Sequence, residues 1–275
     1  SINVMSTSSN VAQSQCVVDI LEKIASKSGG QLNKDTAVVL TDENLLMPLL
    51  YALPEKFKKE QRNESGEVVN PAINVTMGYP LRNTLAYSFV ERLLELQKHA
   101  QSGDDELNEP TFYYVDVDGL LSHPYIADVS TSQYSELRAE IVKHRMFQVP
   151  ASMLTKSSLL EKLFRKTGNW LELSEYLLDV IDTVAIASES GEEKAFRSEF
   201  LAMVSEALSK LQSVVIQCNV AISEQIYASL VRRHLQAERV PFTGEPLEGL
   251  QVMGILETRN LDFKNVILLS MTDNN

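Results

Sequence analysis

The chain has 275 residues, of which 44% are hydrophobic and 23% charged, so it is long and apolar enough to bury a core. Its formal net charge of −12 argues against tight DNA binding by the chain alone, because that affinity comes mainly from Lys and Arg meeting phosphates. No apolar run reaches the roughly 18–20 residues of a membrane span, and no secretory signal pattern is visible. We therefore expect a cytoplasmic protein that makes no membrane contact.

The first hundred residues alternate between helical and strand patterns. Residues 10–26 carry apolar side chains at helical spacing, and 36–41 (TAVVLT) predict a short buried strand. Asp42 is a good N-cap for the helix that follows this strand. Residues 73–77 predict a second strand and 83–99 a second helix with one apolar face. Strands alternating with helices are typical of a parallel sheet covered by helices.

The middle of the chain has a different character. Residues 101–109 form an acidic linker, and after it the strand patterns largely disappear. Helical periodicity then recurs in six stretches, at 120–126, 134–144, 157–166, 170–188, 192–216 and 223–238. This region is predicted to be entirely helical.

The C-terminal stretch 245–272 returns to strand patterns. Its two short apolar runs, 250–256 and 266–271, predict buried strands. The link between them, 257–263, contains an acid, a hydroxyl and an arginine. These polar side chains would lie at a strand end, which is where open α/β sheets place their ligands.

This stretch resembles a known family. Residues 253–263, MGILETRNLDF, are similar in length and ending to the T-x-H-x-S/A-K-G-L-E-F motif in the second RecA-like domain of superfamily one helicases. The form with Glu-Thr-Arg and Leu-Asp-Phe looks most like AddB-type helicase–nucleases and their RecB-type relatives, a group of the PD-(D/E)XK nuclease superfamily that acts on broken DNA ends. Residues 36–55 and 73–96 look like the motif IV region of this family and the strand–turn–helix after it.

The resemblance implies a fold and a domain division. It implies an α/β, RecA-like (P-loop NTPase-like) parallel-sheet domain built from residues 1–104 and 240–275. A helical insertion subdomain at 105–239 interrupts this domain. The chain stops at 275, where the family's Asn-Glu-Gly-x-x-Pro loop would begin, so we expect it to be a piece of a larger protein.

Several catalytic patterns are missing from the sequence. It has no G-x-x-x-x-G-K-[ST] loop (Walker A), no H-E-x-x-H and no G-x-S-x-G. The acid and lysine pattern of PD-(D/E)XK nucleases is not visible either. We therefore expect a fragment without catalytic activity or a cofactor of its own, whereas the resemblance implies an ATP- and Mg-dependent helicase and exonuclease as the parent protein.

The resemblance also points to individual residues. Thr258 falls on the family's Ser/Ala and Arg259 on its Lys, in a motif that touches the DNA backbone and couples it to the nucleotide. Leu256 replaces the usual His and Asn260 the usual Gly, which favours a motif kept for structure or DNA scanning over a motor. The alternative is that Arg259 only pairs with Asp262 at the strand end.

Two further sets of residues are candidates for DNA contact. Tyr79 follows a predicted strand and could stack on a base, with Arg82 on a phosphate; the alternative is a plain turn at Gly78. Arg232 and Arg239 would line one face of the last predicted helix and could meet duplex phosphates. The alternative for this pair is a solvated helix face.

The function expected from these patterns is that of a non-catalytic second helicase-like domain of an AddB/RecB-type helicase–nuclease in DNA repair and recombination. It would contact single-stranded DNA or a duplex end, or couple to the missing ATPase domain, with an AddA-like helicase subunit as a candidate partner. A helicase-derived protein-interaction module, with the helical insertion as docking surface, is the first alternative. An unrelated α/β nucleotide-binding domain is the second.

Overall fold

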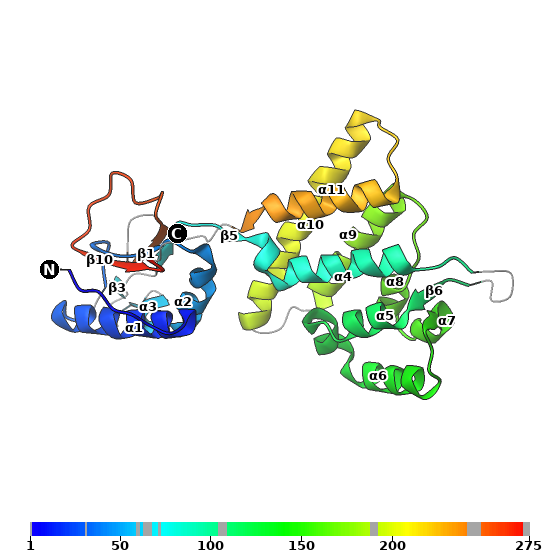
Figure 1. The fold of residues 1–275 in the computed structure, drawn as a ribbon, viewed down its shortest axis with the longest axis horizontal. Coiled ribbons are helices and arrows are strands. Elements are labelled where there is room, and N and C mark those ends of the chain that lie inside the picture. The colour runs from blue at the N-terminus through cyan, green and yellow to red at the C-terminus, as the bar shows by residue number, and fades with distance from the viewer. Residues whose placement is uncertain are drawn as a thin grey trace. The chain divides into compact units, whose positions relative to one another are not determined.

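The computed structural model describes residues 2–30, 32–58, 61–62, 68–70, 73–103, 109–187, 192–240 and 249–271. The chain divides into two compact units (Figure 1). Ser1–Tyr79 and Pro241–Asn275 form the first, which we call the α/β unit; Pro80–Val240 form the second, the helical unit.

The α/β unit contains a parallel sheet, which in its described residues has four strands. Their order is β10 (Asn265–Leu269), β1 (Thr36–Leu40), β9 (Gln251–Gly254) and β4 (Asn74–Val75). Each neighbouring pair is parallel, with β1 between β9 and β10. All five residues of β1 are buried, as expected for an apolar strand at the centre of such a sheet. The α/β class expected from the sequence is confirmed.

The helices of the α/β unit follow the predicted signals. Helix α1 (Asn10–Lys27) starts at Ser9, whose side chain accepts a hydrogen bond from the Ala12 N–H at 3.2 Å. It lies along one side of the sheet (Figure 1). After β1, Asp42 caps the first turn by accepting from the Asn44 N–H at 3.0 Å. The elements after this cap are η1 (Glu43–Leu45), α2 (Leu46–Ala52), α3 (Glu55–Lys58), β2 (Gln61–Arg62) and β3 (Val68–Asn70).

The two C-terminal strands differ in burial. Strand β9 is buried throughout, as predicted, whereas β10 alternates between covered and exposed residues. In the register of the sheet, Val266 and Leu268 lie beside Ala37 and Val39 of β1, but they are 50% and 49% exposed. The expectation of a buried second strand is therefore wrong for β10, which lies at the edge of the sheet that the described residues form.

The helical unit begins earlier than the sequence analysis placed it. Helix α4 (Leu85–His99), assigned above to residues 1–104 of the α/β part, contacts α5, α10 and α11 and belongs to the helical unit. Its buried face is formed by Ala86, Phe89, Val90, Leu93, Leu94, Leu96 and Gln97. The boundary therefore falls at 79/80, because the apolar face of α4 packs on other helices.

The other elements of the helical unit follow in chain order. They are η2 (Leu81–Asn83), β6 (Thr111–Tyr113), α5 (Tyr114–Leu121), α6 (Pro124–Lys143), β7 (Gln148–Pro150), α7 (Ala151–Leu154), α8 (Ser158–Leu163), α9 (Trp170–Ala187), α10 (Glu192–Cys218) and α11 (Glu224–Ala237). Strands β5 (Tyr79–Pro80) and β8 (Arg239–Val240) form a two-stranded sheet. Strand β6 pairs with β7 in an antiparallel ladder, so the prediction that this region is entirely helical is wrong: its two three-residue strands are too short for a clear strand pattern. Among the described residues, no helix is long and apolar enough to span a bilayer.

Candidate functional site

The carboxyl edge of the sheet brings together the residues that follow three strands. Leu40, the last residue of β1, lies in register with Gly254 at the end of β9 and Leu269 at the end of β10. Thr41 and Ser270 therefore continue from the same edge as the segment 255–264, which joins β9 to β10. Ligands of open α/β sheets bind outside this edge, so it is the first place to look for a site.

Thr41 and Ser270 form a hydrogen-bonded frame at this edge. The Thr41 Oγ1 lies 2.9 Å from the Leu269 carbonyl oxygen and 2.8 Å from that of Ser270, so its hydroxyl can donate to either. The Ser270 N–H donates to the Gln13 Oε1 of α1 at 3.0 Å, and Ser270 has a φ of +57°. These contacts tie the ends of β1 and β10 and the helix α1 together.

The segment 255–264 is a turn with its own internal bonds. The Thr258 hydroxyl donates to the Ile255 carbonyl at 2.7 Å, and the Leu261 N–H donates to the Thr258 carbonyl at 3.2 Å. Asn260 has a φ of +61°, in the left-handed region that glycine favours and asparagine tolerates. Asn260 therefore does not lose the conformation that a glycine would allow here, contrary to the prediction from the sequence. The known tolerance of asparagine for positive φ was the signal that could have predicted it.

Arg259 is exposed on this turn. Asp262 is exposed as well, and no ion pair joins the two side chains within the described part of the chain. The structure therefore does not show the alternative raised above, in which Arg259 only pairs with Asp262. The guanidinium is open to a ligand, while the Thr258 hydroxyl is used by the turn itself.

Along the chain, three acidic residues follow the strand ends more closely than Arg259 does. A Cβ added to Gly254 would lie 2.5 Å from the Glu257 Oε2, so this carboxylate folds back over the end of β9. Asp42 and Glu43 directly follow Thr41 at the end of β1. Carboxylates in these positions would repel a triphosphate placed at this edge.

Tyr79 and Arg82 fall in different units. The Tyr79 side chain is 9% exposed, and burial, with a smaller contribution from Tyr51, raises the pKa of its phenol. Little of this ring is available for a base to stack on. Arg82 is exposed in η2, and it belongs to the helical unit whereas Tyr79 belongs to the α/β unit.

Arg232 is held by two carboxylates of a neighbouring helix. Its Nε lies 2.8 Å from the Glu91 Oε2 and its Nη2 lies 2.9 Å from the Glu95 Oε1, both on α4. Helix α11 ends at Ala237, so Arg239 lies in β8 and not on the helix face with Arg232. The predicted basic face is thus absent from α11, because one arginine packs the unit and the other lies beyond the helix end.

We expect Arg232→Met to lower the free energy of unfolding of the helical unit by about 1–2 kcal/mol, because it removes two ion pairs at a partly covered position. After the substitution Glu91 keeps the hydrogen bond from the Tyr87 hydroxyl, and Glu95 keeps its pairing with Lys98. The matched control is Arg233→Met on the exposed side of α11, for which we expect a change within about 0.5 kcal/mol. Urea unfolding followed by circular dichroism measures both. Equal midpoints for the two variants would contradict the role given to Arg232.

Ser88 and His123 look at first like a nucleophile and its base. The His123 Nε2 lies 2.9 Å from the Ser88 Oγ. However, its Nδ1 accepts from the Tyr125 N–H at 3.4 Å, so the neutral ring carries its proton on Nε2 and donates it to Ser88, which in turn donates to the Leu85 carbonyl. Burial, helped by the Arg92 charge, lowers the pKa of His123 to about 4. This histidine is a helix cap and cannot activate the serine.

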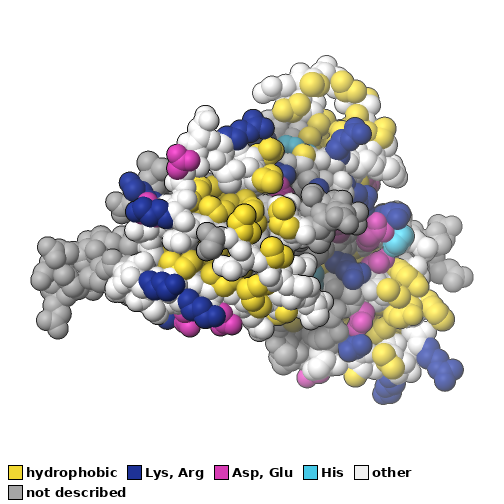
Figure 2. Space-filling view, turned by 60° about the vertical axis from the view of Figure 1, so that its left-hand side comes forward, with side chains coloured by type: hydrophobic (Ala, Val, Ile, Leu, Met, Phe, Trp, Pro, Cys, Tyr) yellow, Lys and Arg dark blue, Asp and Glu magenta, His cyan; other side chains and the backbone are white. Residues whose placement is uncertain are grey.

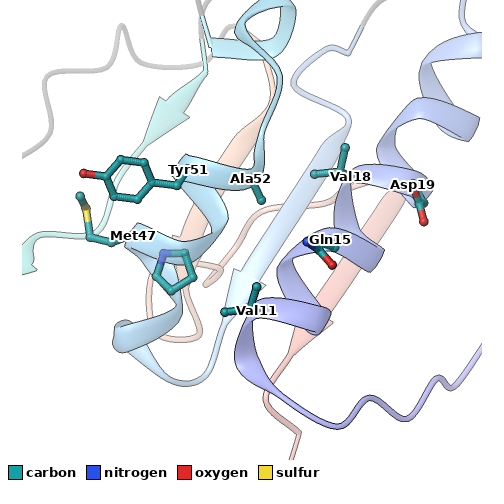
Figure 3. Close-up of a pocket in the computed structure, with 8 residues that line it drawn as sticks. Val11, Gln15, Val18, Asp19, Met47, Tyr51 and Ala52 are labelled. Carbon is teal, nitrogen blue, oxygen red and sulfur yellow. The ribbon is translucent and has the colours of Figure 1, made fainter. Parts of the chain in front are cut away.

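A hollow of about 860 Å³ lies between α1 and α2 (Figure 3). It is lined mainly by apolar side chains, and Gln15 and Asp19 are its only strongly polar residues within the part of the chain described. Small-molecule sites usually combine an apolar lining with several convergent polar groups, which this hollow lacks. No group of three His, Cys, Asp or Glu side chains among the described residues is placed to hold a metal ion.

Basic, acidic and hydrophobic side chains are interspersed on the face of the molecule seen in Figure 2, which shows no continuous basic strip. No protein-family model matches the sequence, and no curated protein is significantly similar to it.

Proposed function

We propose that this chain is a non-catalytic second RecA-like domain of an AddB/RecB-type helicase–nuclease, acting in the cytoplasm on DNA ends during double-strand break repair. The observation that carries this proposal is the turn between β9 and β10. It presents Arg259 to solvent, and Asn260 adopts a left-handed conformation where the family has glycine. The backbone shape that a glycine would allow is thus kept although the residue differs.

The arrangement of elements supports the same proposal. Strand β1 lies between β9 and β10, and the helical unit enters the chain between β4 and β9. The family that the sequence resembles carries a helical subdomain inside its second RecA-like domain. A helical unit between strands of one parallel sheet therefore supports the proposal, although this unit begins earlier than the resemblance alone suggested.

The chemistry of the edge suits contact with a DNA backbone better than nucleotide hydrolysis. Arg259 offers one exposed cation to a phosphate, a contact that positions DNA without reading its sequence. The carboxylate of Glu257 at the end of β9 and the missing Walker A pattern both disfavour a nucleotide at this edge. ATP, Mg and the motor would come from the rest of the parent protein or from an AddA-like subunit.

The test is the binding of a blunt-ended hairpin DNA by the wild-type chain and by Arg259→Ala, measured by fluorescence anisotropy at several salt concentrations. We expect the substitution to weaken binding about fivefold and to reduce the salt dependence by about one phosphate contact. Lys23→Ala on α1 is the control for loss of an exposed charge. Unchanged affinity and salt dependence in Arg259→Ala would exclude this contact.

A protein-interaction role for the helical unit is the second candidate. The observation in its favour is that Arg232 is occupied by Glu91 and Glu95, which removes the basic face that α11 was predicted to offer to DNA. The protein-interaction role is supported if the hairpin DNA does not bind to the wild-type chain.

A further inference from the structure

A row of aromatic rings runs across the surface of the helical unit where α4, β6 and α5 meet the segment before β7. His99 contacts Tyr113 with ring centroids 6.3 Å apart, Tyr113 contacts Tyr114 at 5.2 Å, and Tyr114 contacts Phe147 at 6.0 Å. Each contact is edge-to-face, with interplanar angles of 87°, 74° and 81°.

Phe147 is the exposed end of this row. Its side chain is 72% exposed, although the Tyr114 N–H donates to its carbonyl at 3.1 Å and holds the two residues side by side. Its backbone position is therefore fixed while much of its ring faces solvent. A ring presented in this way can take a flat ligand against it without a change in the backbone.

Basic residues precede Phe147 directly. Lys143, His144 and Arg145 end helix α6 and are all exposed. Within the described part of the chain, none of the three forms an ion pair. Two acids of the neighbouring helices α6 and α5 are already paired with cations: Glu140 with Lys156 at 3.4 Å and Asp118 with Arg138 at 3.0 Å. This surface is therefore locally basic on a chain with a net charge of −12.

The turn that ends α6 fixes the position of Arg145. The Arg145 N–H donates to the Val142 carbonyl and the Met146 N–H to the Ile141 carbonyl, both at 3.2 Å, which is the Schellman pattern of helix ends. Arg145 has a φ of +49°, a conformation in which glycine is usual at this position. The position after the end of α6 thus favours glycine but carries Arg145, whose charged side chain lies two residues before the exposed ring of Phe147.

We propose that Tyr114, Lys143, Arg145 and Phe147 form a platform for single-stranded nucleic acid. A base stacks on Phe147 and Tyr114, and the adjoining phosphates meet Lys143 and Arg145. Aromatic rings combined with cations bind single strands with little sequence preference, because every base has a flat face and every linkage a charge. This proposal deepens the proposed function and rests on it for the choice of DNA, but the platform is separate from the sheet edge that carries Arg259.

The experiment uses the full chain and a fluorescein-labelled 15-nucleotide oligo-dT, with binding measured by anisotropy at low and at physiological salt. Phe147→Ala removes the ring, and we expect about 5- to 100-fold weaker binding, the range that stacking of one base supplies. Phe147→Tyr keeps a ring and should bind nearly as the wild type does.

Arg145→Gly removes the charge of this side chain without disturbing the backbone, so it separates an effect on binding from an effect on stability. Glycine adopts the positive φ without strain, so this variant should be at least as stable as the wild type and yet bind oligo-dT more weakly, with a smaller salt dependence. Arg145→Lys keeps the charge and should restore most of the salt-dependent affinity. Thermal unfolding of each variant shows that any loss of binding does not come from loss of the fold.

The results separate the two proposals. Wild-type affinity for oligo-dT in both Phe147→Ala and Arg145→Gly would overturn the platform, and so would failure of the wild-type chain to bind oligo-dT at low salt. Neither result bears on the hairpin DNA, whose binding and sensitivity to Arg259→Ala decide the contact at the sheet edge. Weaker oligo-dT binding by the platform variants, with Arg259→Ala unchanged, would support the platform alone.

Discussion

Phe89→Ala is expected to lower the free energy of unfolding of the helical unit by about 3–5 kcal/mol, because it removes a large buried ring and leaves a cavity. Phe89 lies on the buried face of α4 and is 0% exposed. Its ring centroid lies 5.2 Å from that of His123 and 5.7 Å from that of Tyr125, so it joins α4 to the start of α6. Urea unfolding followed by circular dichroism measures the loss.

The chain offers a matched control for this substitution. Phe147→Ala removes the same ring from a position that is 72% exposed, and we expect a change in stability within about 0.5 kcal/mol. A similar loss in both variants would show that the burial of Phe89 does not determine the stability of this unit.

Acidification is expected to destabilise the helical unit through His123. Its pKa is lowered from 6.5 to about 4 in the folded state by burial and by the charge of Arg92. Below pH 6.5 the unfolded chain takes up a proton that the folded chain does not accept until about pH 4, so stability is present in full above pH 6.5 and falls between these two values. The difference in pKa corresponds to a loss on the order of 3 kcal/mol.

His123→Asn tests this dependence. Asparagine can still cap α6 by accepting from the Tyr125 N–H, but it does not titrate. The variant should be less stable at pH 7 and should lose less stability than the wild type between pH 6.5 and 4. His144→Asn, at an exposed position, should keep the wild-type pH dependence. Identical pH profiles for His123→Asn and the wild type would show that carboxylates alone cause the acid sensitivity.

Local patterns predicted the elements of the α/β unit well. The apolar run of β1, the periodicity of α1 and the cap at Asp42 all act within a few residues, and each appears in the structure. The exposure of β10 could not be predicted in this way, because it depends on the order of strands in the sheet. The apolar face of α4 showed that the helix packs, but not that its partners are other helices.

The candidate site also combines features that the sequence predicted with features that only the structure revealed. The sequence placed Arg259 at a strand end, but the conformation of Asn260 became visible only in the structure. The pairing of Arg232 with Glu91 and Glu95 joins residues 141 and 137 positions apart, beyond the reach of local patterns. The row of aromatic rings was missed because basic residues were weighed by their density, whereas a basic run beside aromatic residues, as in 143–147, was the more useful signal.

The order of the strands along the chain has a consequence for biosynthesis. The hydrogen bond between Thr41 and Leu269 joins residues 228 positions apart, whereas the helical unit is one continuous segment, Pro80–Val240. The ribosome completes that segment before it synthesises β9 and β10, the two neighbours of β1. The helices can therefore fold while β1 is still unpaired. An apolar strand kept unpaired for so long invites aggregation, and we expect nascent chains of this protein to depend on a chaperone that shelters the N-terminal segment until β9 and β10 emerge.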